Sequence, residues 1–165
     1  MSYVAKYNFD IVIKNDTGTC GNDMFHIKSK KDLFCKIDKL LSKNYSISLS
    51  PYYDIHCEYR AIILKDNIEL IYGKRKPVVF GDGKSTIYEL LCRFNKNYFE
   101  KASSEKKLDK VLNCNEKYEY NWQFNLSKGA MPFLIEDEIK KNNIENMAKF
   151  VANILGVSFA SIDII

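Results

Sequence analysis

The chain has 165 residues, the size of one ordinary domain or of two small lobes, and 46% of its residues are apolar, which suffices for a folded core. The net charge of +4 is mild and acids alternate with bases along most of the chain, so no basic block favours nucleic acid. The five cysteines lack C-x-x-C spacing, which argues against disulfides and zinc, and no apolar run approaches the roughly 20 residues of a membrane span, so we expect a cytoplasmic protein without membrane partners.

Residues 10–14 form the first predicted strand, a short apolar run that ends in Lys14. The loop that follows, residues 15–22, contains Gly18 and Gly21. A lysine at the edge of a loop with free backbone N–H groups can line an anion. The same pattern is typical of a plain β-hairpin, and the residues alone leave both interpretations open.

Ser29, with Asp32 three residues later, predicts the start of a helix. Its apolar stripe is predicted to be core and consists of Leu33, Phe34, Ile37, Leu40 and Leu41. Residues 45–49 predict a strand that ends at Pro51. No acid or nucleophile stands at diagnostic spacing from either histidine, so neither His26 nor His56 is predicted to act as a general base.

Residues 57–64 and 68–73 are rich in β-branched and aromatic side chains and flank a polar turn, which predicts a β-hairpin. Glu58 and Arg60 stand two residues apart and therefore point to one face of the sheet, where they can pair with each other. Three consecutive cations, residues 74–76, precede a proline.

The turn Gly81-Asp82-Gly83-Lys84 looks like a phosphate loop, but a P-loop requires glycine at the position of Val78. The sequence therefore favours a strand-to-helix connector whose two glycines are free to take positive φ. Thr86 and Glu89 predict a capping box at the start of the next helix.

The polar, lysine-rich residues 95–115 are predicted to form a surface excursion with a short helix near Leu108. Residues 118–124 then predict a strand with Tyr118, Tyr120 and Trp122 on one face. Such an aromatic row is either a packed sheet face or a stacking platform for single-stranded nucleic acid, and the packed face is the commoner case.

A long helix is predicted from about residue 136 to 155, with Gly156 as its stop. Its predicted inward residues are Ile144, Met147, Ala148, Val151, Ile154 and Leu155. The apolar strand that follows, residues 157–165, carries one acid, Asp163. A lone carboxylate in such a strand is costly unless it is paired or binds a metal.

Taken together these motifs resemble the ATP-grasp ligases, most nearly the branch of cyanophycin synthetase, the ATP-grasp part of bifunctional glutathione synthetase and the RimK-like ligases. The similar features are E-Y-R on a strand, R-x-P, V-x-G-D-G-K-x-T-I-x-E-L and N-L-S-x-G-A. The likeness runs from about Ile11 to Ile165 and is sharpest at residues 81–90 and 125–129. It implies an α+β fold of two small lobes with mainly antiparallel sheets, residues 1–53 and 54–165.

The resemblance also implies ATP and Mg²⁺ as ligands. Lys14 would then be a phosphate ligand, and Gly18 and Gly21 would be hinges of the loop that covers the phosphates, although Asn15 replaces the usual proline. Leu49, Tyr52 and Tyr53 would line the adenine, and Glu58 would face the ribose or a metal. The remaining implied roles are phosphate neutralisation by Arg75 together with Lys14, cofactor binding by Lys74, contact with the acyl phosphate by Asn125 and magnesium binding by Asp163.

The implied reaction joins a carboxylate to an amine through an acyl phosphate, with small-molecule or peptide substrates. The family's N-terminal lobe and the Glu-x-Asn pair that follows the Asp163 strand are absent from these 165 residues, so we expect a piece of a larger ligase rather than a pared-down relative. A non-catalytic nucleotide-binding or protein-interaction module is the alternative, and a homodimer is left open.

Overall fold

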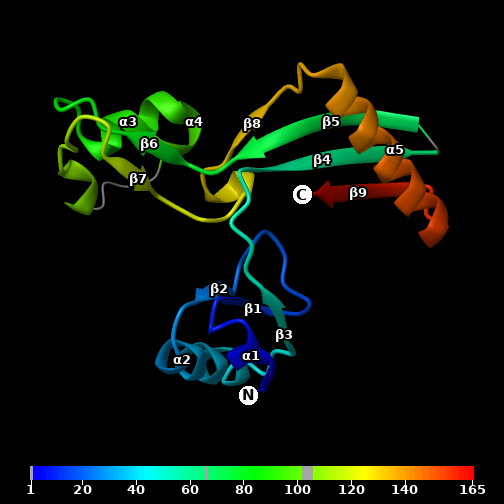
Figure 1. Cartoon of the computed structure of the whole chain (residues 1–165), viewed down its shortest axis with the longest axis horizontal. Coiled ribbons are helices and arrows are strands. Elements are labelled where there is room, and N and C mark those ends of the chain that lie inside the picture. Colours follow the sequence, from blue (N-terminus) through cyan, green and yellow to red (C-terminus); the bar gives the residue numbers. More distant parts are fainter. Residues whose placement is uncertain (1, 66, 102–105) are drawn as a thin grey trace. The chain divides into compact units, whose positions relative to one another are not determined.

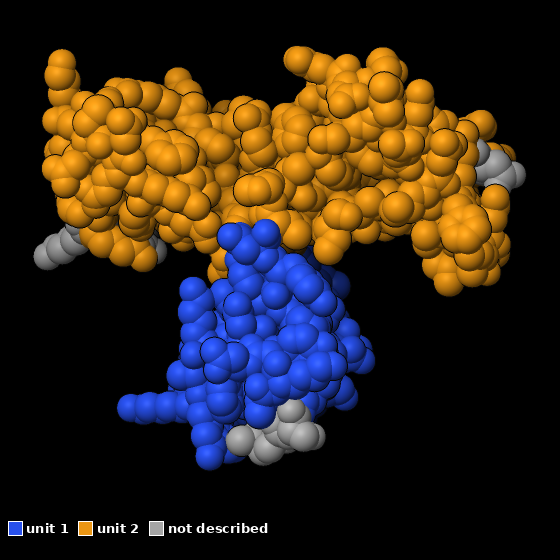
Figure 2. Space-filling view, in the orientation of Figure 1, with its two compact units in different colours: residues 1–54 blue, residues 55–165 orange. Residues whose placement is uncertain are grey.

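The computed structural model describes residues 2–65, 67–101 and 106–165. The chain divides into two compact units, residues 1–54 and 55–165, coloured separately in Figure 2. Each unit combines helices with antiparallel sheet, so the predicted α+β class is confirmed (Figure 1). Within the described residues, no helix is both long and apolar enough to cross a membrane.

The first unit is a three-stranded antiparallel sheet with two helices. Its strands run in the order β2-β1-β3 and comprise β1 (Ile11–Asn15), β2 (Met24–Ile27) and β3 (Ile47–Pro51). The helices are α1 (Ser2–Lys6) and α2 (Lys30–Leu41), and the Ser29 hydroxyl caps α2 by accepting from the Asp32 N–H, as predicted. The loop after β1 is therefore the connection of a β-hairpin.

Only part of the predicted stripe on α2 is core. Leu33 and Leu40 are buried and Ile37 packs beside them, because these residues are spaced four and three apart on the side that faces the sheet. Phe34 and Leu41 are about half exposed, so their prediction as core is wrong. They lie on the flank of the helix, beyond the reach of a three-stranded sheet.

The second unit contains a four-stranded antiparallel sheet in the order β8-β5-β4-β9. Its strands are β4 (Cys57–Leu64), β5 (Asn67–Arg75), β8 (Met131–Phe133) and β9 (Phe159–Ile164). The predicted hairpin is confirmed by the pairing of β4 with β5. One face is covered by α5 (Glu138–Leu155), which packs across β4, β5 and β9 (Figure 1).

The line of α5 that faces the sheet is built from small residues. Ala148 and Ala152 are buried against Ala61 and Ile63 of β4. Small side chains let the helix backbone approach the sheet closely, so the larger residues are displaced to the flanks. Three predicted inward residues are consequently exposed, which corrects the prediction for Met147, Ile154 and Leu155.

A second core of this unit lies outside the four-stranded sheet. It is built around α3 (Ile87–Phe94) and the two-stranded sheet of β6 (Val78–Phe80) and β7 (Lys117–Glu119), with α4 (Lys96–Phe99) and η1 (Lys106–Asp109) beside them. The short helix η2 (Leu126–Lys128) precedes β8. Phe99, Leu108 and Leu112 are buried in it, so the prediction of a surface excursion is wrong for these residues.

The predicted aromatic row serves this second core. The strand β7 ends at Glu119, five residues earlier than expected for residues 118–124. Tyr118 and Tyr120 pack against the core, and the ring of Tyr120 meets that of Phe99 edge-on, with centroids 5.0 Å apart. This arrangement matches the packed alternative rather than a stacking platform.

The turn before α3 is a connector, as predicted. The capping box between Thr86 and Glu89 is present. The Asp82 carboxylate accepts from the backbone N–H groups of Lys84 and Ser85, so the turn's own acid occupies them, and the bonds from Ser85 hold the pKa of Asp82 well below its usual range.

Close approach, rather than positive φ, explains the first glycine of that turn. Gly83 has φ of 73°, but Gly81 does not have a positive φ, which corrects the expectation for this position. A Cβ on Gly81 would lie 2.1 Å from the carbonyl oxygen of Asn113. Only glycine therefore fits where the chain segment near Asn113 crosses the turn.

Candidate functional site

Four charged side chains converge on the face of the four-stranded sheet that α5 does not cover, here called the open face. Residues paired across antiparallel strands point to the same side. Glu58 of β4 is paired with Lys74 of β5, and Arg60 of β4 is paired with Asp163 of β9. Alternation along β4 then brings all four side chains to one surface.

Lys74 is the centre of this group. Its side chain is 3% exposed, and its Nζ donates to the carboxylate of Glu58 and, over 2.9 Å, to Oδ1 of Asp163. Burying an ammonium group is costly unless it is paired and hydrogen-bonded. The two carboxylates meet that requirement, and they are themselves more accessible, at 22% and 42% exposed.

Arg60 completes the group with a bidentate contact. Its Nε donates to Oδ1 of Asp163 over 2.8 Å and its Nη2 donates to Oδ2 over 2.7 Å. The planar guanidinium fits the two oxygens of a carboxylate and so fixes the orientation of Asp163.

The charges in the group stabilise one another. Burial alone would raise the pKa of Asp163, but hydrogen bonds from Arg60 and Lys74 outweigh it and lower the pKa. The same bond to Asp163 raises the pKa of Arg60. The ion pairs of the open face therefore hold two cations and two anions in fixed positions.

This arrangement has the donor set for a polyanion with a divalent cation. Mg²⁺ in proteins takes one or two carboxylates and completes its shell with water and substrate phosphates. Glu58 and Asp163 meet at the same ammonium group and supply two such carboxylates. A cluster of three or more candidate ligands, which a site made of protein alone would need, does not occur in the part of the chain that the structure describes.

Arg75 lies on the other face of the sheet, here called the covered face. It follows Lys74 directly on β5, and successive residues of a strand point to opposite sides. Its guanidinium carbon lies 4.8 Å from the centre of the Phe133 ring. The structure therefore does not bring Arg75 and Asp163 to one phosphate, contrary to the expectation from the sequence.

Asn125 stands at the start of the short helix η2, before β8. Its carbonyl oxygen accepts from the N–H groups of Lys128 and Ala130, which closes the loop, and Gly129 takes a φ of 95°. The amide of Asn95 donates to the carbonyls of Gly129 and Ala130 over 3.4 and 3.2 Å. The loop is thus a fixed turn that leads into the strand beside Arg75.

The remaining predicted residues belong to the first unit. Lys14 is on β1, where it is paired with Met24 and Ser48. Gly18 and Gly21 lie in the loop between β1 and β2, and Gly21 has a φ of 68°.

Leu49 is a β3 residue, and Tyr52 and Tyr53 follow that strand. Tyr52 stacks on His26 with the ring centroids 3.7 Å apart, whereas Tyr53 is 64% exposed. His26 also contacts the Asp10 carboxylate, at 2.5 Å between Nε2 and Oδ1. Sequence spacing missed that acid because strand pairing, not proximity in the chain, brings the two together.

The sequence analysis also did not predict two features of the open face, the partner of Arg60 and the burial of Lys74. The sequence placed Arg60 near Glu58, but its partner is Asp163, 103 residues later. Lys74 was predicted to bind the cofactor, but its burial was not predicted. The spacing of Glu58 and Arg60, two residues apart on β4, predicted that both lie on one face of the sheet. It could not predict which residue of β9 is paired with Arg60.

No family model and no curated protein matches the chain. Among solved structures, the chain is similar to the crystal structure of a bifunctional glutathione synthetase from Pasteurella multocida, with 15% identity and a TM-score of 0.44. The match covers 99% of this chain and 25% of that protein, so the chain spans about a quarter of its length. A likeness this loose does not establish a shared fold.

Proposed function

We propose that the chain is the ATP-binding region of a ligase that joins a carboxylate to an amine. The observation that carries the proposal is the open face, where buried Lys74 is held between Glu58 and Asp163 and Arg60 locks the second acid. Fixed cations beside carboxylates are what a triphosphate with magnesium requires. The motifs around residues 81–90 and 125–129 support the same assignment.

In this proposal the two cations of the open face bind phosphate oxygens. Lys74 and Arg60 exchange their carboxylate partners for the phosphates, and they offset negative charge as the γ-phosphoryl group moves to the substrate carboxylate. Asp163 and Glu58 would hold Mg²⁺, which supplies further charge neutralisation on the phosphates. The amine then attacks the acyl phosphate and releases phosphate.

The first unit is proposed to bind the nucleotide too. Lys14 with the glycine loop would contact phosphates, and Leu49, Tyr52 and Tyr53 would contact the adenine. Loop amides and a lysine are suited to phosphate oxygens, and the exposed ring of Tyr53 is suited to stacking on a base.

Titration calorimetry with ATP, with and without magnesium, tests the proposal. Asp163→Asn should weaken binding in the presence of magnesium about tenfold and leave the magnesium-free affinity within about threefold, because the amide is a poor Mg²⁺ ligand. Asp109→Asn is the matched control, since Asp109 is an exposed acid of η1 and loses the same charge. Absence of any heat with folded wild-type protein would overturn the assignment.

A second candidate function is a nucleotide-binding or interaction module without catalysis. The observation that favours it is that the four charges of the open face already satisfy one another. In that case ATP binding would not change with Asp163→Asn at any magnesium concentration.

A further inference from the structure

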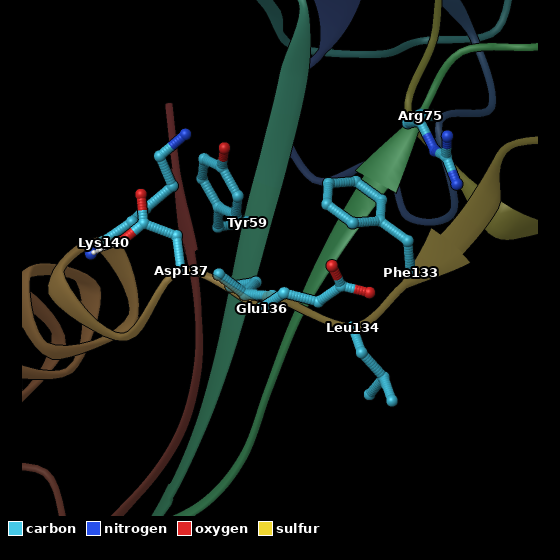
Figure 3. Close-up of a pocket in the computed structure, with 8 residues that line it drawn as sticks. Tyr59, Arg75, Phe133, Leu134, Glu136, Asp137 and Lys140 are labelled. Carbon is cyan, nitrogen blue, oxygen red and sulfur yellow. Dashed lines mark hydrogen bonds between the residues drawn. The ribbon is translucent and has the colours of Figure 1, made fainter.

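The covered face of the four-stranded sheet contains a cavity of about 540 Å³ (Figure 3). Its lining includes Tyr59 of β4, Arg75 of β5, Phe133 of β8, and Glu136 in the segment before α5. Asp137, whose carboxylate caps α5 by accepting from the Lys140 N–H, and Lys140 complete the charged part of the lining. The volume is in the range of sites that bind small ligands, roughly 300–1,000 Å³. The open face has no part in it, because these side chains project from the other side of the same strands.

A glycine builds the floor of this cavity. A Cβ on Gly73 would lie 2.2 Å from Cζ of Phe133, so the ring can lie across β5 only because Gly73 has no side chain. The guanidinium of Arg75 then lies over that ring, and the ring of Tyr59 meets it edge-on at 6.4 Å. Arg75 is therefore oriented by an aromatic surface rather than by an acid.

The charges around the cavity are available to a ligand. Over the described residues, neither Arg75 nor Glu136 takes part in a side-chain hydrogen bond or an ion pair, in contrast to Arg60 on the open face. The Nζ of Lys140 lies 5.8 Å from the centre of the Tyr59 ring, and interaction with the Tyr59 hydroxyl raises the pKa of Lys140. Figure 3 shows Lys140 with Tyr59 at one end, Arg75 at the other, and the Phe133 ring and the Glu136 carboxylate between them.

We propose that this cavity binds a small zwitterion of the amino-acid class. The ligand's carboxylate bonds to a cation of the cavity, principally Arg75, and its ammonium group bonds to Glu136. Tyr59 and Phe133 supply the apolar walls. A simple anion would be repelled by Glu136 and a simple amine by Arg75 and Lys140, so a ligand that carries both charges fits best. This site is separate from the proposed ATP site and does not depend on it.

Chemical-shift titration of the folded chain, without nucleotide, tests this inference. The probes are L-leucine, L-glutamate and L-lysine, each titrated separately to tens of millimolar. At least one should bind saturably and shift resonances of Gly73 and residues 133–140. Failure of all three to bind would overturn the proposal.

Derivatives of the amino acid that binds test the contribution of its ammonium group and of its carboxylate one at a time. Its N-acetyl form lacks the ammonium group and its amide lacks the carboxylate, and each should bind about tenfold more weakly or worse. An N-acetyl form that binds as well as the free amino acid would also overturn the proposal.

Substitutions in the cavity test which residue binds each charged group of the ligand. Arg75→Gln and Glu136→Gln should each weaken binding about tenfold, whereas Glu138→Gln, a neighbouring exposed acid, should not. In Glu136→Gln the N-acetyl derivative should bind no worse than the free amino acid. Binding that survives both variants of the cavity unchanged would contradict the site.

Discussion

On the open face of the four-stranded sheet, Lys74 and Arg60 are bonded to Glu58 and Asp163, whereas on the covered face Arg75 lies over a ring and has no acid partner within the described chain. Lys74 and Arg75 are consecutive residues of β5, so these two different environments belong to neighbouring positions. Charge that is buried must be neutralised, and charge at a cavity rim remains in contact with water. Adjacent cations in a sequence can therefore have unrelated functions.

The largest expected effect comes from removing the buried cation. Lys74→Met leaves two carboxylates without their shared donor, so we expect a loss of roughly 3 kcal/mol in the free energy of unfolding. Urea denaturation followed by the fluorescence of Trp122, the only tryptophan and part of the second unit, measures it. An unchanged midpoint would show that the ion pairs of the open face are dispensable.

The glycine under Phe133 gives the next effect. Gly73→Ala places a methyl group against the ring, and overpacking of this kind costs roughly 1–3 kcal/mol. The same change in a Phe133→Leu background should cost less, because the obstructing ring is gone. Additive effects in this double-mutant cycle would argue against the close contact.

The pH dependence of stability distinguishes the faces further. Asp163 has a lowered pKa in the folded state, so its contribution is present above the unfolded value of about 3.9 and is lost as the pH falls below it. The stability difference between wild type and Asp163→Asn, about 1 kcal/mol at neutral pH for a half-exposed carboxylate, should shrink between pH 5 and pH 3.

Urea midpoints of both proteins across that pH range provide the measurement. Asp109→Asn is the control, because Asp109 is exposed. A difference between wild type and Asp163→Asn that grew in acid would contradict the assigned charges.

The smallest loss of stability is expected at Arg75, the residue next to Lys74. Arg75→Met removes a cation that has no ion pair, so stability should change by no more than about 0.5 kcal/mol. Because both variants replace a cation of β5 by methionine at neighbouring positions, Arg75→Met is the matched control for Lys74→Met. Equal losses at both positions would remove the contrast between the two faces.

Local features of the fold could be predicted from the sequence. The β4–β5 hairpin, the cap at Ser29 and the capping box at Thr86 depend on residues within a few positions of one another. Their determinants are turn chemistry, alternation and capping hydrogen bonds, all of which are visible in a short window.

Features that depend on distant partners could not be predicted. The role of Asp163 with Arg60 requires the register of β9 against β4, and the exposure of Met147 follows from alanines that face the sheet. The separation of Lys74 from Arg75 was implicit in strand alternation. It could be assigned to faces only once α5 was known to cover one side.

Asp163 lies on β9, which is paired with β4 and, within the residues that the structure describes, with no other strand. The bond from Asp163 to Lys74 passes over β4 to the next strand, so it ties the rim of the sheet to its interior. A ligand that binds Lys74 and Arg60 breaks their bonds to Asp163 and so removes this link between β9 and the rest of the sheet. The amide hydrogens of β9 would then exchange faster as ligand binds to the open face, so hydrogen exchange in β9 reports how much of the protein is in complex.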